Sequence, residues 1–211
     1  MPLPGAFVYT ELQISVPFDA VPVDRINAAI QARAGFLNKT WLSGFASGSA
    51  GGFYAFDTVA DAVGFVTDYF PDEAKGFGVA QTTRIYDATA LAEASRSAGS
   101  VHFGARHAEP AAFVYSEAQV ALDPARYDTA AANAALAATT GHLSRTWLSG
   151  LNTGTLGAFD AFSSLEAAQK FALETYPAEA ASLGAAFTTR LFEAATTKAA
   201  SLKMSSPYYP A

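Results

Sequence analysis

Two arginines and two glutamates occupy equivalent places in a chain rich in apolar residues. Arg84 and Arg190 lie within predicted last strands, and Glu11 and Glu117 lie within predicted first strands. If first and last strands are neighbours, Glu11–Arg84 and Glu117–Arg190 could form cross-strand ion pairs, because a buried charge needs a partner. Alternatively, either arginine could bind an enolate or a carboxylate and stabilise negative charge that develops during a reaction.

Four aromatic residues complete this set of candidates. Tyr9 and Tyr115 precede the two glutamates by two residues and share their strand face, where either could orient or protonate a substrate. Trp41 and Trp147 are the only tryptophans and lie at matching strand positions. Large aromatic side chains dominate protein cores, so each tryptophan either packs in the core or lines a pocket.

Differences between the two halves indicate where one half could have an activity of its own. At four equivalent positions Phe36, Asn38, Lys39 and Tyr54 are replaced by His142, Ser144, Arg145 and Asp160. His142 and Asp160 fall on predicted hairpin strands and could form a general-base pair. A histidine at the start of a strand is, alternatively, an exposed residue without a catalytic role.

The candidates come in pairs because the sequence repeats itself at a spacing of 106 residues. Residues 7–9 (FVY) return as 113–115, residues 40–44 (TWLSG) as 146–150, and residues 82–84 (TTR) as 188–190. Self-similarity at a fixed period indicates a duplicated structural unit. A half of about 100 residues would be modestly stable alone, so the two copies are expected to pack on each other.

Each half predicts the element order β-α-β-β-α-β of the ferredoxin-like split unit, which makes the fold class α+β. The first half predicts strands over 7–16, 36–43, 53–57 and 79–86 and helices over 25–34 and 59–70. The second half predicts strands over 113–122, 142–149, 159–163 and 185–192 and helices over 125–139 and 165–176. The Gly/Ser-rich residues 44–52 predict a loose connection, and Pro71 and Pro177 predict helix ends.

The predicted organisation has three parts. The first ferredoxin-like repeat spans 1–99, a linker spans 100–112, and the second repeat with a C-terminal tail spans 113–211. The tail sequences 100–103 (SVHF) and 206–209 (SPYY) occupy equivalent positions. Each tail is expected to lie across the opposite half, because apolar side chains that recur in both copies must be buried.

The amino-acid composition argues against several classes of partner and cofactor. The 211-residue chain has a net charge of −6, which argues against a nucleic-acid partner. It has no cysteine, which excludes disulfides and thiolate chemistry. His102, His107 and Glu109 lie in the linker without further ligands, so no metal site is expected. Without a signal peptide or a membrane-spanning segment, a cytoplasmic protein with no membrane partner is expected.

Three stretches carry a family resemblance: residues 35–41 (GFLNKTW), 51–56 (GGFYAF) and 78–87 (GVAQTTRIYD). In this pattern the chain resembles the dimeric α+β barrel superfamily, and within it the small bacterial monooxygenases of the YdhR type, relatives of the antibiotic-biosynthesis monooxygenases. The resemblance implies that the sheets of the two tandem repeats pair as an intramolecular dimeric α+β barrel. A chain that supplies both sheets is expected to be a monomer.

The resemblance also implies a function. It favours a small enzyme that oxygenates an apolar aromatic or polyketide-like molecule without a metal, a flavin or any other cofactor. In the relatives an aromatic side chain near the position of Trp41 and Trp147 can line the substrate cavity, so the resemblance implies that these two residues line a pocket. Glu11, Glu117 and Asn38 are further expected substrate-binding residues. Such a reaction requires a substrate that forms its own carbanion or enolate in a dry pocket. Cyclase or isomerase chemistry would use the same groups, and a non-catalytic binding or structural barrel is a second hypothesis, because one fold hosts many functions.

Overall fold

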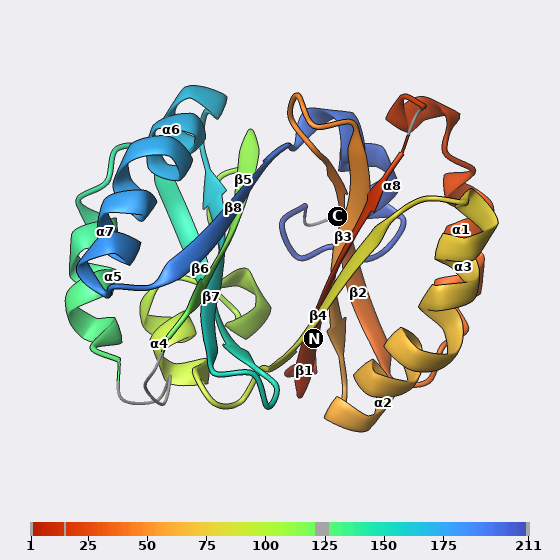
Figure 1. Ribbon diagram of the computed structural model, residues 1–211, viewed down its shortest axis with the longest axis horizontal. Coiled ribbons are helices and arrows are strands. Elements are labelled where there is room, and N and C mark those ends of the chain that lie inside the picture. The colour runs from red at the N-terminus through yellow and green to blue at the C-terminus, as the bar shows by residue number, and fades with distance from the viewer. Residues whose placement is uncertain (1, 15, 121–126, 210–211) are drawn as a thin grey trace. The chain divides into compact units, whose positions relative to one another are not determined.

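The computed structural model describes residues 2–14, 16–120 and 127–209, which fall into two compact units. The first unit combines residues 2–86 with residues 193–211, and the second unit consists of residues 87–192. In each unit the long helices cover one face of a four-stranded sheet (Figure 1). Within the described ranges no helix is long and apolar enough to cross a membrane.

The sheet of the first unit has the strand order β2-β3-β1-β4, as the split unit predicts. Its strands are β1 (Ala6–Gln13), β2 (Phe36–Ser43), β3 (Ser49–Phe56) and β4 (Gln81–Asp87). The prediction of a loose connection up to residue 52 is wrong, because Gly51 and Gly52 belong to β3. A Cβ on Gly51 would lie 2.0 Å from the Thr10 carbonyl oxygen of β1, so the glycine permits close strand pairing.

The helices of the first unit are α1 (Val23–Gln31), α2 (Val59–Gly64) and α3 (Phe70–Phe77), with a short 3-10 turn, η1 (Phe18–Ala20), before α1. A π-helical turn, η2 (Phe65–Tyr69), joins α2 to α3 without a break. The predicted helix end at Pro71 is therefore wrong. Proline has no N–H to donate to the preceding turn, and the wider turn accommodates that loss while the helix continues.

The second unit repeats this architecture with the strand order β6-β7-β5-β8. Its elements are β5 (Ala112–Gln119), α5 (Thr129–Ala137), β6 (His142–Gly150), β7 (Thr155–Phe162), α6 (Leu165–Lys170), the π-helical turn η5 (Phe171–Thr175), α7 (Tyr176–Ser182) and β8 (Ala186–Glu193). The predicted strand residues 121–122 and helix residues 125–126 lie outside the described residues. Both units are thus ferredoxin-like, as the sequence predicts.

The segment that follows each repeat packs on the sheet of the other repeat, as predicted for the tails. Helix α8 (Lys198–Leu202), after the 3-10 turn η6 (Ala195–Thr197), lies along β2: the Trp41 amide donates to Ser201 Oγ at 2.9 Å, and the Lys39 amide donates to the Met204 carbonyl at 3.1 Å. Helix α4 (Ala92–Ser97) and the 3-10 turn η3 (Val101–Phe103) lie in the second unit, where the Trp147 amide donates to Ser95 Oγ at 2.9 Å. These contacts satisfy backbone donors that an edge strand would otherwise expose.

Candidate functional site

Two rows of side chains on the helix-covered face of the first sheet form the floor of the candidate site. Strand pairing aligns Lys39 of β2 with Tyr54 of β3, and Trp41 with Gly52 one row further along. Tyr54 and Trp41 belong to the apolar core under α1 and α3. A Cβ on Gly52 would lie 2.5 Å from Lys39 Cε and 2.8 Å from the Tyr54 ring, so this glycine leaves the space into which both side chains lean.

Lys39 is the unusual residue of this floor. Its side chain is completely buried, and its Nζ has no hydrogen-bond partner among the described residues. Nζ lies 2.9 Å from the centroid of the Trp41 ring and 4.8 Å from that of Tyr54. Loss of water around the ammonium group lowers the Lys39 pKa well below its usual value, and the negative charge of Glu73 only partly offsets this effect.

The two aromatic rings beside Lys39 are held by hydrogen bonds at their edges. Trp41 Nε1 donates to Asn27 Oδ1 of α1 at 2.8 Å, and the Tyr54 hydroxyl lies 3.2 Å from Thr10 Oγ1. Burial and the nearby Glu73 charge raise the Tyr54 pKa well above its usual value, so this phenol stays protonated. Hydrogen bonds therefore hold both rings in place, whereas none among the described residues holds the Lys39 amine between them.

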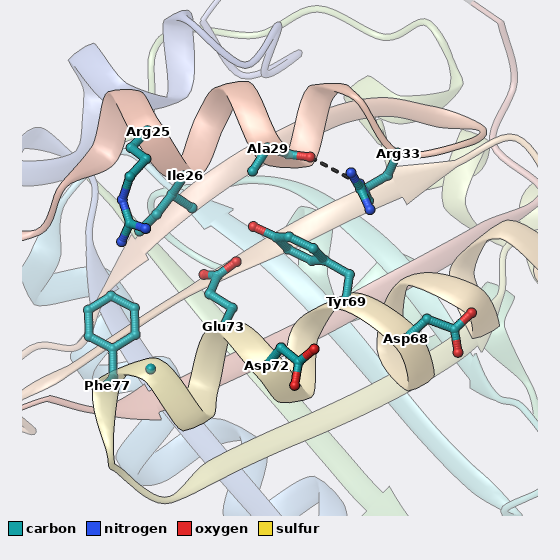
Figure 2. Close-up of a pocket in the computed structure, with 10 residues that line it drawn as sticks. Arg25, Ile26, Ala29, Arg33, Asp68, Tyr69, Asp72, Glu73 and Phe77 are labelled. Atoms are coloured by element: carbon teal, nitrogen blue, oxygen red, sulfur yellow. Dashed lines mark hydrogen bonds between the residues drawn. The ribbon is translucent and has the colours of Figure 1, made fainter.

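Two residues from the opposite helix face this floor. Glu73 of α3 has a buried Oε2 without a hydrogen-bond partner among the residues that the structure describes. Tyr69, the last residue of the π-helical turn, points toward Glu73 (Figure 2), and burial together with this carboxylate raises the Tyr69 pKa. The Arg33 guanidinium of α1 lies 5.1 Å from the Tyr69 ring centroid. The Glu73 carboxylate and the Tyr69 phenol thus lie about one helical turn apart.

A groove between α1 and α3, which we call the α1–α3 groove, is lined by Arg25 and Arg33 of α1 and by Tyr69, Glu73 and Phe77 of the facing helix, among others (Figure 2). Its volume is about 590 Å³. A small inner cavity of about 10 Å³, enough for about one water molecule, lies deeper, against Lys39, Trp41 and Tyr54. The groove and the inner cavity share Ile26, Glu73 and Phe77 as lining residues, so these three side chains separate the outer space from the amine.

In the second unit the equivalent place holds a paired network beside an inner cavity of about 10 Å³ that Arg145 and Trp147 line. Arg145 Nε and Nη2 donate to the two oxygens of Asp160 at 2.8 and 3.1 Å, and His142 Nε2 lies 2.9 Å from Asp160 Oδ1. The Arg145 guanidinium also lies 4.6 Å from the Trp147 ring centroid. Burial opposes both charges, but their mutual attraction outweighs it, so the Arg145 pKa is raised and the Asp160 pKa is lowered. This network is a stable ion pair with a histidine attached.

The sheets separate the other predicted site residues from this face. Alternation along β1 and β2 places Tyr9, Glu11 and Asn38 on the face away from the helices, and the Tyr9 hydroxyl donates to Glu11 Oε2 at 2.9 Å. In the second unit Tyr115 and Glu117 form the same pair at 2.5 Å. The structure therefore brings each tyrosine to its glutamate, but it does not bring Tyr9, Glu11 or Asn38 to Trp41.

The two arginines of the last strands also lie on that far face. Ile85 and Leu191 pack against the helix-covered cores, so their neighbours Arg84 and Arg190 point the other way. Both arginines are exposed, which differs from the expectation of buried charges within apolar strands. Each guanidinium donates to the preceding residue's carbonyl, Arg84 to Thr83 at 2.9 Å and Arg190 to Thr189 at 3.0 Å. The cross-strand pairs with Glu11 and Glu117 stay a prediction.

Sequence reasoning missed Lys39 and Glu73 as site residues. One signal was available: Lys39 and Tyr54 change together, to Arg145 and Asp160, and they face each other across one strand pair. Glu73 gives no such signal, because Glu179 stands at the equivalent position. In the described part of the chain no cluster of three His, Asp or Glu residues is arranged to hold a metal ion.

The comparisons with known proteins identify the fold. Neither a protein-family model nor a curated protein matches the sequence. Among solved structures, an anthrone oxidase-like protein superposes with a TM-score of 0.63 at 13% identity, over 89% of this chain and 90% of that one. A mutant chlorite dismutase from Candidatus Nitrospira defluvii superposes with a TM-score of 0.52 at 10% identity, over 94% of this chain and 96% of that one.

A further solved structure, a candidate monooxygenase from Lactobacillus acidophilus, superposes with a TM-score of 0.52 at 11% identity over 90% of this chain and 93% of that one. The chain therefore shares its fold with these proteins, two of which are described as an anthrone oxidase-like protein and a candidate monooxygenase, and this is the fold that the sequence resemblance implied. At these identities the likeness establishes the fold alone, and the chemistry must be argued from the residues of the chain.

Proposed function

We propose that the first unit oxygenates an aromatic carbon acid with molecular oxygen and without a cofactor. A carbon acid is here a molecule whose CH₂ group is acidified by a neighbouring carbonyl group and aromatic rings. The observation that carries the proposal is the Lys39 amine, which is buried between two aromatic rings without a hydrogen-bond partner in the described structure. The lowered pKa of this amine increases the fraction that is unprotonated and able to accept a proton.

The proposed reaction begins with proton transfer to Lys39. The substrate rings occupy the α1–α3 groove, whose volume of about 590 Å³ suits a molecule of three fused rings, and the acidic carbon points past Glu73 toward the amine. After proton transfer, Lys39 is an ammonium ion beside the new enolate, so the base also becomes the stabilising charge. The inner cavity has room for at most about one water molecule, so bulk water does not weaken this ion pair.

Oxygen completes the proposed reaction. The enolate passes electrons to O₂, the oxygen adds to the same carbon, and loss of water leaves a new carbonyl group. In sum, one CH₂ group and one O₂ molecule become one C=O group and one H₂O molecule. Glu73 borders both the groove and the inner cavity and can carry the proton from Lys39 outward. The similarity to an anthrone oxidase-like protein supports a three-ring ketone as the first substrate to test.

The test uses anthrone, whose oxidation by O₂ yields anthraquinone and water. We expect the chain to accelerate oxygen uptake and anthraquinone formation above the spontaneous rate, and Lys39→Met to abolish the acceleration. Lys75→Met, which removes an exposed lysine of the same unit, is the matched control and should be fully active. Equal rates for wild type and Lys39→Met would overturn the proposal.

A second measurement with anthrone distinguishes oxygenation from cyclase or isomerase chemistry, which needs only the proton transfer. Under nitrogen in heavy water, a proton-transfer enzyme would exchange the CH₂ hydrogens of anthrone for deuterium through Lys39. Exchange without oxygen uptake in air would therefore contradict oxygenation and favour the proton-transfer alternative. Binding of anthrone without deuterium exchange or oxygen uptake would favour the hypothesis of a non-catalytic binding barrel.

A further inference from the structure

Lys39 differs in its surroundings from every other lysine of the chain. The sequence contains five lysines, at positions 39, 75, 170, 198 and 203. Lys75, Lys170 and Lys203 are exposed and Lys198 is half-buried, so water solvates their charged form. Lys39 is the one with no exposed surface. An amine in a dry, aromatic pocket retains its nitrogen lone pair at a pH where exposed lysines are protonated.

We propose that Lys39 captures an aldehyde or ketone as a covalent imine. The Nζ lone pair attacks the carbonyl carbon to give a carbinolamine. The carbinolamine oxygen then leaves as water, taking both hydrogens of the amine, so that one amine and one carbonyl compound become one imine and one water molecule. No oxidant or reductant is consumed. The inference rests on the site of the proposed function but not on its oxygen chemistry.

Three features of the site support imine formation. First, Nζ has no hydrogen bond to break among the described residues, so its lone pair is available for attack. Second, Glu73 borders the inner cavity and has a buried oxygen without a partner, so it can give a proton to the departing hydroxyl and take one from the nitrogen. Third, desolvation lowers the Lys39 pKa, which increases the unprotonated fraction.

The surroundings of the amine also indicate the class of carbonyl compound. The inner cavity is lined by the aromatic rings of Trp41, Tyr54, Phe70 and Phe77, and the α1–α3 groove provides the space beyond them. Because the inner cavity holds only about one water molecule, the ring of an aromatic aldehyde or ketone would lie in the groove against Tyr69 and Phe77, and only its carbonyl group would reach past Glu73 to the amine. The second unit offers no equivalent, because Arg145 is paired with Asp160 and a guanidinium is not deprotonated in proteins. We therefore expect one reactive amine per chain.

The experiment uses benzaldehyde with sodium cyanoborohydride, which reduces an imine to a stable benzylamine. The folded full chain is treated at neutral pH, digested, and mapped by mass spectrometry. We expect Lys39 to be labelled at least about tenfold faster than any other lysine, since each unit of pKa lowering gives tenfold more free amine. Protein unfolded in urea serves as the control and should be labelled at all five lysines.

Two variants make the result decisive. Lys39→Met removes the amine and should lose the fast label, while Lys75→Met should keep it. Gly52→Ala pushes a methyl group against Lys39 Cε and should slow labelling of Lys39 without affecting the exposed lysines. Labelling confined to the exposed lysines of the folded protein would overturn the inference, as would an unchanged fast label in Lys39→Met.

Oxygen uptake with anthrone, measured in the same preparations, distinguishes this inference from the proposed function. A fast label on Lys39 without accelerated oxygen uptake would support carbonyl capture and contradict oxygenation. Oxygen uptake that depends on Lys39, without labelling of Lys39 by benzaldehyde, would support the base role and contradict imine formation.

Discussion

Lys39 Nζ lies 2.9 Å from the centroid of the Trp41 ring, directly over the indole face. A cation over an aromatic face gains an electrostatic attraction of about 2 kcal/mol or more when water is excluded. This attraction does not replace the hydration that a buried ammonium ion loses, because the idealised cost of moving a charge into an apolar interior is of order 20 kcal/mol. The Lys39 amine can therefore be either charged or neutral in this contact, which suits the proposed transfer of a proton to and from it.

Substitution of Lys39 by methionine should stabilise the first unit. Methionine fills a similar volume without a polar atom, and a buried polar group without a partner costs about 1–3 kcal/mol. We expect Lys39→Met to raise the free energy of unfolding by about that amount at neutral pH, measured by urea denaturation. Lys75→Met, on the exposed surface, should leave it unchanged. A clear loss of stability in Lys39→Met would indicate that the amine has a structural partner.

The pH dependence of that stability has a definite sign. The folded-state pKa of Lys39 is lower than that of an unfolded lysine, about 10.4. Between these two values the folded state binds fewer protons, so the stability of the wild type rises with pH. Lys39→Met should remove this rise. The measurement is the difference in unfolding free energy between the two proteins at several pH values from about 7 to 10. A difference that does not change over this range would contradict a lowered Lys39 pKa.

The sequence predicts the fold well and the site poorly, for physical reasons. The β-α-β-β-α-β order and the crossing of the tails follow from the repeat and from apolar periodicity, and both are confirmed. The pairing of His142 with Asp160 also follows from hairpin neighbours, and the two side chains lie 2.9 Å apart. The partner that governs this pair, Arg145, was noted only as a difference between the halves, because the sequence does not reveal that it faces Asp160 across the strands.

Two features of the site could not be predicted from the sequence: the strand face that each side chain occupies and the π-helical turn before Pro71. Trp41 lies on the edge strand β2 and Tyr9 on the central strand β1. Opposite strand faces keep the two side chains apart, and only the registers of β1 and β2 against β3 establish this. Tyr69 and Glu73 lie around and beyond the predicted helix end at Phe70. The π-helical turn that carries the helix past Pro71 places them opposite α1, and no local pattern predicts that turn.

Gly52→Ala tests whether the space beside Lys39 matters. The added methyl group would lie 2.5 Å from Lys39 Cε and 2.8 Å from the Tyr54 ring, so both side chains must shift to accommodate it. Since Ala158 occupies the equivalent position of the second unit, the sheet itself tolerates alanine there. We expect Gly52→Ala to fold with a melting temperature within a few degrees of wild type and to lose most anthrone oxidation. Ala158→Gly is the reciprocal control and should be fully active. Full activity of Gly52→Ala would mean that the position of the amine is not critical.

The paired network of the second unit should be structural. Asp160→Asn leaves the buried Arg145 charge without a counter-ion, which costs about 3–5 kcal/mol. The double change Arg145→Met/Asp160→Leu removes both charges and should recover most of that loss. The free energies of unfolding of Arg145→Met, Asp160→Leu and the double variant, compared in a mutant cycle, measure the coupling. Equal losses in Asp160→Asn and the double variant would contradict a strong pair.

The same network predicts acid sensitivity. The Arg145 charge and the His142 contact outweigh desolvation and hold the Asp160 pKa below its usual value of about 3.9. The stabilisation is therefore present above about pH 4 and is lost as the pH falls through the folded-state pKa. We expect the wild type to lose stability below about pH 4 more steeply than the Arg145→Met/Asp160→Leu variant, as measured by thermal melts. Parallel acid profiles would show that Asp160 does not contribute.

The two tryptophans allow a direct test of which unit binds the ligand. Trp41 lines the inner cavity beside Lys39, whereas Trp147 lines the equivalent cavity of the second unit, where Arg145 is paired with Asp160. Anthraquinone-2-sulfonate does not react with oxygen, and it quenches indole fluorescence at short range. We expect it to quench the Trp147→Phe variant, which retains Trp41, with saturation, and to leave the Trp41→Phe variant nearly unchanged. The opposite order would move the binding site to the second unit, where Arg145, Tyr176 and Glu179 line the cavity.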